Sequence, residues 1–84
     1  QKADQPFYLL VPFYAPHTPF DFQPEQYRVP YKDVKFSCFP RGEKHPWQNP
    51  GLARNHNNEE SFRSYSALIS GVDHNVGRVV KFLE

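Results

Sequence analysis

The sequence predicts an α/β fold built from one strand, a long insertion and one helix. Three observations support it: an apolar run at residues 6–14, an aromatic-rich stretch at about 29–57, and an apolar stripe at helical spacing over about 59–84. An unbroken apolar run of this length is typical of a strand buried on both faces. A strand and a helix joined in this way form one piece of an α/β layer rather than a complete domain.

The size and charge of the chain exclude several classes of partner. Its 84 residues carry a formal net charge of +1 with both signs interspersed, so we expect no nucleic-acid partner. No apolar run approaches the ~20 residues of a membrane-spanning helix. The chain contains no methionine, and we expect it to be an internal or processed part of a longer protein.

The apolar run ends in a loop framed by two prolines. Pro16 and Pro19 fix φ on either side of His17 and cannot continue a ladder, so we expect a stiff loop at residues 15–21. Ligands of open α/β sheets usually bind at the carboxyl ends of the strands, where this loop would lie. Imidazole suits acid–base chemistry near neutral pH. The alternative is that His17 only bonds a carbonyl of its own loop.

The middle of the chain, about 29–57, has no regular period. An irregular loop of this length is usually functional or disordered, and its aromatic residues argue against disorder. We therefore expect an ordered surface insertion. Trp47 either stacks on a sugar ring or packs the insertion against the rest of the protein. His56 either faces a ligand or helps to cap the helix that follows.

The helix over about 59–84 is the clearest element. Its apolar positions recur at helical spacing: Tyr65, Leu68, Ile69, Val72, Val76, Val79, Val80 and Leu83. Asn57 followed by Glu60 predicts a capping box at its start. Gly77 and Arg78, near its end, are assigned to structure.

Four potential metal ligands fall in the loops. Cys38, His17, His45 and His56 fit no zinc-binding spacing, so we expect no metal site from them. A nucleophilic pair of Cys38 with a histidine would need a third group to orient the imidazole, and the sequence shows none.

Residues 13–20, Phe-Tyr-Ala-Pro-His-Thr-Pro-Phe, resemble the sulfatases of the alkaline-phosphatase superfamily. In that family an apolar strand leads into Ala-Pro-His-Thr-Pro and then into a Pro-Glu-x-Tyr stretch, which residues 24–27 match. Residues 73–78 on the last helix, Asp-x-x-Val-Gly-Arg, also look like the family's. Residues 36–54 look like the insertion of bacterial glycan sulfatases.

The resemblance implies that residues 1–84 are an internal segment of an alkaline-phosphatase-like sandwich, whose parent chain hydrolyses sulfate esters of carbohydrates. The family's histidine contacts the sulfate and protonates the leaving alcohol, a role that carries over to His17. Trp47 and His56 become candidates for substrate contact. The resemblance also implies a sulfated small molecule or glycan as substrate, the remainder of the sulfatase chain as partner, and a periplasmic, secreted or lysosome-like compartment.

The family's site uses a formylglycine and a divalent metal, usually calcium. The formylglycine arises from Cys-x-Pro-x-Arg, whereas Cys38 is followed by Arg41 one place too early, so Cys38 is interpreted as an ordinary loop cysteine. We expect calcium and formylglycine in the parent protein, with no ligands for either here and no activity of the segment alone. The alternatives are a related phosphoryl or sulfuryl transferase and a non-catalytic carbohydrate-binding module.

Overall fold

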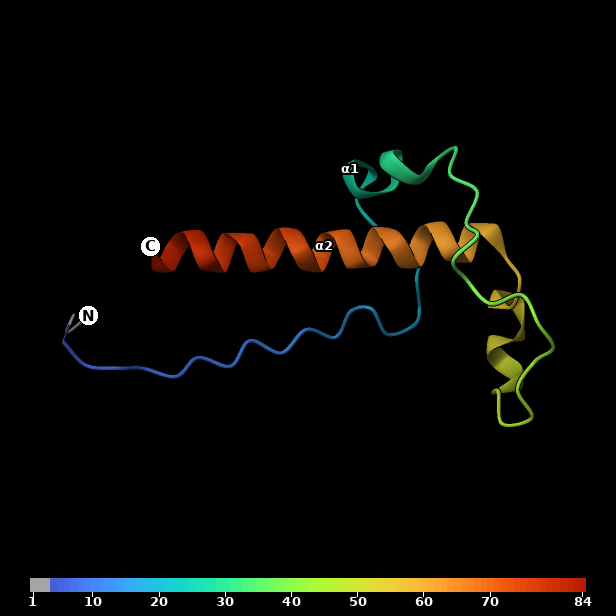
Figure 1. The fold of residues 1–84 in the computed structure, drawn as a ribbon, viewed down its shortest axis with the longest axis horizontal. Coiled ribbons are helices and arrows are strands. Elements are labelled where there is room, and N and C mark those ends of the chain that lie inside the picture. The colour runs from blue at the N-terminus through green and yellow to red at the C-terminus, as the bar shows by residue number, and fades with distance from the viewer. Residues whose placement is uncertain (1–3) are drawn as a thin grey trace.

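A single long helix organises the structure, a computed structural model that describes residues 4–84. The elements are α1 (Glu25–Arg28), the 3-10 helices η1 (Val29–Tyr31) and η2 (Pro50–Asn55), and α2 (Glu59–Leu83). The molecule is elongated, 54 × 31 × 22 Å. Figure 1 shows α1 lying against α2, the insertion folded around the start of α2, and the N-terminal segment running back alongside it. Within residues 4–84, no helix is long and apolar enough to cross a membrane.

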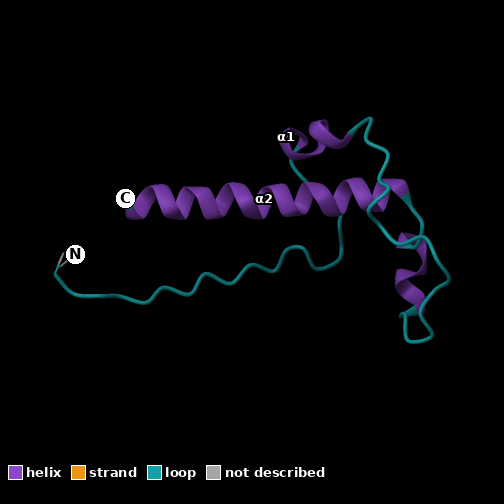
Figure 2. Ribbon diagram, viewed as in Figure 1, coloured by secondary structure: helices purple, strands orange, loops and turns teal. Residues whose placement is uncertain are grey.

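The predicted α/β fold class is wrong for the described residues, which contain helices and no strand (Figure 2). Residues 6–14 are extended, but the described chain offers no second strand to pair with them. A strand needs a neighbour that accepts and donates its backbone hydrogen bonds. Pro12 also lacks the N–H that a central strand would use. The apolar run therefore adopts an extended conformation without forming a sheet.

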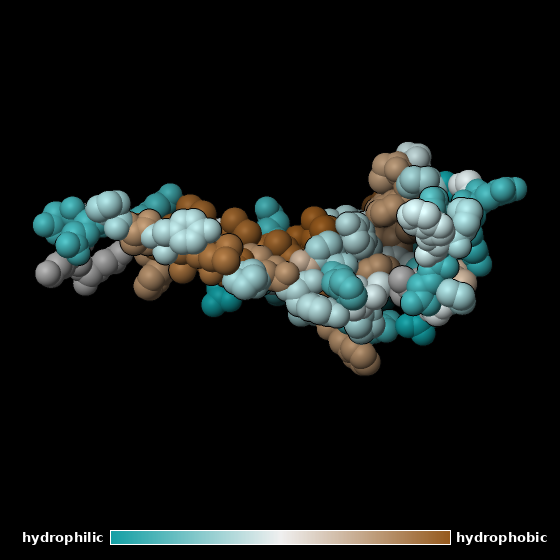
Figure 3. Space-filling view, turned by 90° about the horizontal axis from the view of Figure 1, so that it is seen from below, coloured by the Kyte–Doolittle hydropathy of each residue, from teal (hydrophilic) through white to brown (hydrophobic). Residues whose placement is uncertain are grey.

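The extended segment still shows the two-sided alternation of a strand. Leu9, Val11 and Phe13 point toward the last turns of α2 and line a shallow groove with Val79. The alternate side chains point away from the helix and are 70–87% exposed: Tyr8, Leu10 and Tyr14. Figure 3 shows the resulting apolar surface along this half of the molecule.

Helix α2 begins at an asparagine cap. The Oδ1 atom of Asn58 accepts hydrogen bonds from the backbone N–H groups of Glu60 (2.9 Å) and Ser61 (3.2 Å). The capping residue is thus Asn58, and the predicted cap at Asn57 is off by one residue. Asn57 instead has φ 53°, in the left-handed region that asparagine tolerates in tight turns.

The core lies between the insertion and the first half of α2. Within the described chain, the buried apolar side chains are Phe36 of the insertion and Phe62, Ala67 and Leu68 of α2. Phe39 stacks on Phe62 with ring centroids 4.4 Å apart and planes 3° apart. The insertion therefore packs against α2 through its aromatic side chains. It is not irregular throughout, because η1 and η2 lie inside it.

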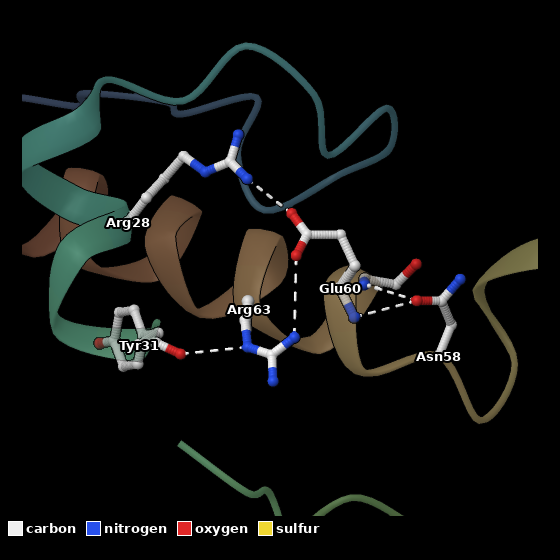
Figure 4. A network of polar contacts seen from close by, with 6 residues as sticks. Arg28, Tyr31, Asn58, Glu60 and Arg63 are labelled. Carbon is white, nitrogen blue, oxygen red and sulfur yellow. Dashed lines mark hydrogen bonds and ion pairs between the residues drawn. The ribbon is translucent and has the colours of Figure 1, made fainter. Parts of the chain in front are cut away.

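An ion-pair network fastens α1 and η1 to the start of α2 (Figure 4). Glu60 accepts from Arg28 at 2.6 Å and lies 3.8 Å from Arg63. The Nε atom of Arg63 donates to the carbonyl of Tyr31 at 3.2 Å, which adds η1 to the network. These groups are largely exposed, so each pair contributes only about 0–1 kcal/mol. The network fixes the position of α1 more than it adds stability.

Candidate functional site

The loop at residues 15–21 holds His17 through its neighbours. The backbone N–H of His17 donates to the carbonyl of Tyr14 at 3.1 Å, which closes a tight turn. The hydroxyl of Tyr14 donates to the carbonyl of Thr18 at 3.3 Å, and the Tyr14 and His17 rings lie 4.9 Å apart. Pro16 and Pro19 fix φ on both sides. The imidazole is exposed, and its loop is restrained by the hydrogen bonds among Tyr14, His17 and Thr18.

The two ring nitrogens of His17 have different surroundings. Its Nδ1 lies 2.8 Å from the carbonyl of Thr18, and a carbonyl only accepts hydrogen bonds. The proton of the neutral imidazole is therefore on Nδ1. This leaves Nε2 as the atom that can take up a proton and pass it to a ligand. The two predicted alternatives for His17 are thus compatible, because the loop carbonyl occupies only one nitrogen.

A groove of about 490 Å³ begins beside the His17 loop, and we call it the aromatic groove. Thr18, next to His17 in the chain, lines one end. The rest of the lining comes from the His17 loop, the insertion and α2: Phe20, Phe39, Pro40, Gly42, Glu43, His45, Gln48, Asn55, His56, Asn57, Ser61, Phe62 and Tyr65. Tyr65 meets both Phe20 (5.7 Å) and Phe39 (5.9 Å) edge to face. The groove therefore has an aromatic floor and polar groups along its walls.

His56 lines the aromatic groove and also joins its two walls. Its Nε2 lies 2.9 Å from the carbonyl of Gly42, so Nε2 carries the proton of the neutral ring and Nδ1 is the acceptor. Its backbone N–H donates to Ala53 at 3.2 Å and closes η2. His56 therefore does not cap α2, which is the role of Asn58.

Trp47 lies at the edge of the insertion with its side chain 91% exposed. Its ring meets His45 edge to face at 5.7 Å, and its backbone N–H donates to Nδ1 of His45 at 3.2 Å. Because so much of the indole is exposed, it does not pack the insertion against the rest of the described chain. Through His45, Trp47 is adjacent to the aromatic groove.

Arg41 fixes the groove-bearing insertion to α2. Its guanidinium donates to the carbonyl of Phe36 at 2.8 Å, pairs with Glu59 and lies 5.1 Å from the ring centroid of Phe62. The hydrogen bond from Arg41 and its positive charge hold the pKa of the Glu59 carboxyl below its ordinary value of 4.5, although partial desolvation opposes the shift.

The residues that complete the groove were missed by sequence reasoning. Phe20 and Phe39 are not among the site residues that the sequence predicts, and Tyr65 is predicted only as part of the apolar stripe of the helix. These residues come from three separate stretches of chain, so no local spacing connects them. The signal that could have indicated the groove was the aromatic content of the insertion, together with the aromatic residues Phe62 and Tyr65 in the first two turns of the helix.

The structure offers no metal centre in the part of the chain that it describes. Within residues 4–84, no group of three or more histidine, cysteine, aspartate or glutamate side chains is arranged to hold a metal ion. Cys38 is exposed and lies outside a formylglycine motif. The described residues therefore do not fit calcium or formylglycine.

The sequence matches the Sulfatase family over residues 1–84. The chain therefore belongs to the Sulfatase family, and the resemblance seen at the His17 loop and the last helix is confirmed. No curated protein and no solved structure matches the chain significantly. Membership in this family connects the chain to the hydrolysis of sulfate esters.

Proposed function

We propose that these residues form part of the active site of a formylglycine-type sulfatase that hydrolyses sulfate esters of carbohydrates. Two observations support a catalytic chain longer than 84 residues. The described core is small, and chains of this size bury too little surface to be very stable. The extended segment also leaves large apolar side chains exposed, including Leu10 at 70%. Calcium and formylglycine would then come from the remainder of that chain, which is the partner of this segment.

The observation that carries the proposal is that the two ring nitrogens of His17 have different partners. Nδ1 bonds the carbonyl of Thr18, and Nε2 is left to donate a proton. Hydrolysis replaces the bond between sulfur and the bridging oxygen with a bond to an oxygen that comes from water, and the departing alkoxide needs a proton. Charged His17 supplies it from Nε2, so the alcohol leaves neutral and the imidazole becomes neutral. A sulfate beside the ring favours the charged imidazolium before the reaction. The hydrogen bond from Nδ1 to Thr18 keeps the ring oriented throughout.

Trp47 and His56 are proposed to contact the substrate. The indole of Trp47 is 91% exposed and presents a large apolar face beside the groove. His56 uses Nε2 to hold Gly42, so its Nδ1 is the atom that accepts a hydrogen bond from a substrate hydroxyl. Both residues lie in the insertion, where loops commonly set specificity.

Sulfate release by the full-length protein tests this function. We expect His17→Ala to lower turnover of a sulfated hexose by about 10²–10⁴-fold, the usual contribution of a general acid. The matched control is His74→Ala, because His74 is an exposed histidine of α2 whose ring packs against Tyr27. Thermal unfolding of both variants should match that of the wild type. Equal turnover by His17→Ala and wild type would contradict the proposal.

A further inference from the structure

We propose that Tyr14 is the residue that positions His17 for proton transfer. The inference rests on the proposed function, in which His17 donates the proton, and it adds a second side chain to that step. Tyr14 is a positioning residue, since it acts on the imidazole and not on the reacting atoms. It acts through its ring and through the carbonyl of Thr18, which the two side chains share.

The carbonyl oxygen of Thr18 joins the side chains of Tyr14 and His17. It lies 2.8 Å from Nδ1 of His17, and it accepts from the hydroxyl of Tyr14 at 3.3 Å. A carbonyl oxygen has two lone pairs, so it can accept from both groups at once. The position of this oxygen sets the direction of the bond to Nδ1. The Tyr14 hydroxyl therefore helps to orient the imidazole by holding the oxygen in place.

The ring of Tyr14 also contacts the imidazole directly. The two ring centroids lie 4.9 Å apart with their planes at 46°, a separation typical of aromatic pairs. The backbone N–H of His17 donates to the carbonyl of Tyr14 at 3.1 Å. An imidazole with a tyrosine ring against one side has fewer rotamers open to it. These contacts keep Nε2 pointing in one direction.

The backbone of the loop does not orient the imidazole by itself. The two prolines of the loop fix φ at their own positions and leave χ1 and χ2 of His17 free. The imidazole is exposed, so the core does not hold it either. The ring of Tyr14 and the carbonyl of Thr18 are the groups that contact it.

Removal of the Tyr14 hydroxyl would have two opposing effects on the bond to Nδ1. The oxygen of Thr18 would lose a second donor, which makes it a better acceptor, and it would lose the contact that fixes its position. Because Tyr14 is 73% exposed, water can donate to the oxygen in place of the hydroxyl and cancel the first effect. The loss of orientation remains, so we expect the variant to hold His17 less well.

The first experiment measures turnover by the full-length protein on a sulfated hexose and on p-nitrophenyl sulfate. We expect Tyr14→Phe to lower kcat on the sulfated hexose about three- to tenfold, the effect of one lost hydrogen bond, and to leave KM within about twofold. Because p-nitrophenolate departs without a proton, kcat on p-nitrophenyl sulfate should stay within about twofold. Tyr8→Phe is the matched control, because Tyr8 is an exposed tyrosine of the same extended segment outside the His17 loop.

A double-mutant cycle tests whether Tyr14 acts through His17. In the His17→Ala background we expect Tyr14→Phe to cause no further loss on the sulfated hexose, because the imidazole that it orients is absent. In the wild-type background, Tyr14→Leu also removes the ring contact and should lower kcat by about 10–100-fold. Tyr14→Phe keeps the ring, so it should retain part of the activity that Tyr14→Leu loses.

The tautomer of His17 gives a second measurement that needs no turnover. Long-range ¹H–¹⁵N NMR correlation, at a pH where the ring is neutral, measures the ratio of the Nδ1–H form to the Nε2–H form. We expect Tyr14→Phe to lower this ratio about three- to tenfold and Tyr8→Phe to leave it unchanged. Thermal unfolding of both variants should match that of the wild type, which separates lost orientation from a lost fold.

The outcomes separate the role of Tyr14 from the proposed function. If sulfate esters are hydrolysed but Tyr14→Phe behaves like Tyr8→Phe, the role of Tyr14 is overturned and the proposed function stands. An equal loss on both substrates, or the same loss in the His17→Ala background, also overturns it, because Tyr14 would then act on the fold or on the substrate. If the tautomer ratio falls in Tyr14→Phe but the wild type hydrolyses no sulfate ester, the hold of Tyr14 on the imidazole stands and the proposed function falls. If the ratio does not change and no sulfate ester is hydrolysed, both fall.

Discussion

The hydrogen-bond partners of individual histidines determine what each can do. His17 bonds a carbonyl through Nδ1, whereas His56 bonds a carbonyl through Nε2 and His45 accepts from a backbone N–H at Nδ1. We therefore expect opposite neutral tautomers: Nδ1–H for His17, and Nε2–H for His45 and His56. Long-range ¹H–¹⁵N NMR correlation at a pH where the rings are neutral measures this directly. A proton on Nε2 of His17 would exclude the hydrogen bond to Thr18.

A second residue-level prediction concerns Glu59, whose pKa is lowered mainly by the hydrogen bond from Arg41. Because the carboxyl of the unfolded chain has the higher pKa, the unfolded state binds more protons as the pH falls. The stabilisation by Arg41 is thus fully present above pH 4.5 and is lost as the pH falls through the lower folded value. The melting temperatures of wild type and Glu59→Gln should be compared at neutral pH and below pH 4.5. We expect the difference in melting temperature between the two proteins to be smaller at the lower pH. A constant difference would contradict this account.

The start of α2 is set by one asparagine side chain. We expect Asn58→Ala to lower the free energy of unfolding by about 1 kcal/mol, because Oδ1 caps two backbone N–H groups. Asn57→Gly is the matched variant: its φ of 53° suits glycine, so we expect no loss of stability. Chemical denaturation of the 84-residue chain measures both. If Asn57→Gly lowered the free energy of unfolding more than Asn58→Ala, the capping residue would be Asn57, as the capping-box pattern predicts.

The extended segment and α2 should differ sharply in amide exchange. Residues 7–14 have no ladder partner in the described chain, so we expect their amides to exchange nearly as fast as in an unfolded chain. The amides of buried Ala67 and Leu68 lie inside α2 and should be the most protected. Hydrogen–deuterium exchange with mass spectrometry gives both values in one experiment. Strong protection at residues 7–14 of the monomeric chain would show a pairing that this structure lacks.

These two elements also show what the sequence was able to predict. The helix could be recognised because its hydrogen bonds and its apolar stripe are local properties of residues 59–84. The run at 6–14 has equally clear strand-forming residues, but a strand depends on a partner elsewhere in the chain. Its side-chain alternation is present, and its ladder is not.

For the molecule as a whole, the sequence located His17 and its family but not the aromatic groove. His17 stands in a contiguous proline-framed motif, so its proposed role could be inferred from neighbouring residues. The groove brings Phe20, Phe39 and Tyr65 together from distant stretches, and only the fold reveals that they meet. Likewise, the assignment of the proton to Nδ1 of His17 required the position of the Thr18 carbonyl.

The central claim is that Nε2 of His17 protonates the leaving alcohol of a sulfate ester. The most direct test is the leaving-group dependence of kcat/KM for the full-length wild type and His17→Gln, because glutamine can donate a hydrogen bond but cannot transfer a proton. We expect a shallow dependence for the wild type and a steep one for the variant. The variant should lose about 10²–10⁴-fold on alkyl sulfates and little on p-nitrophenyl sulfate, whose leaving group departs without a proton. Equal slopes for the two enzymes would show that His17 is not the proton donor.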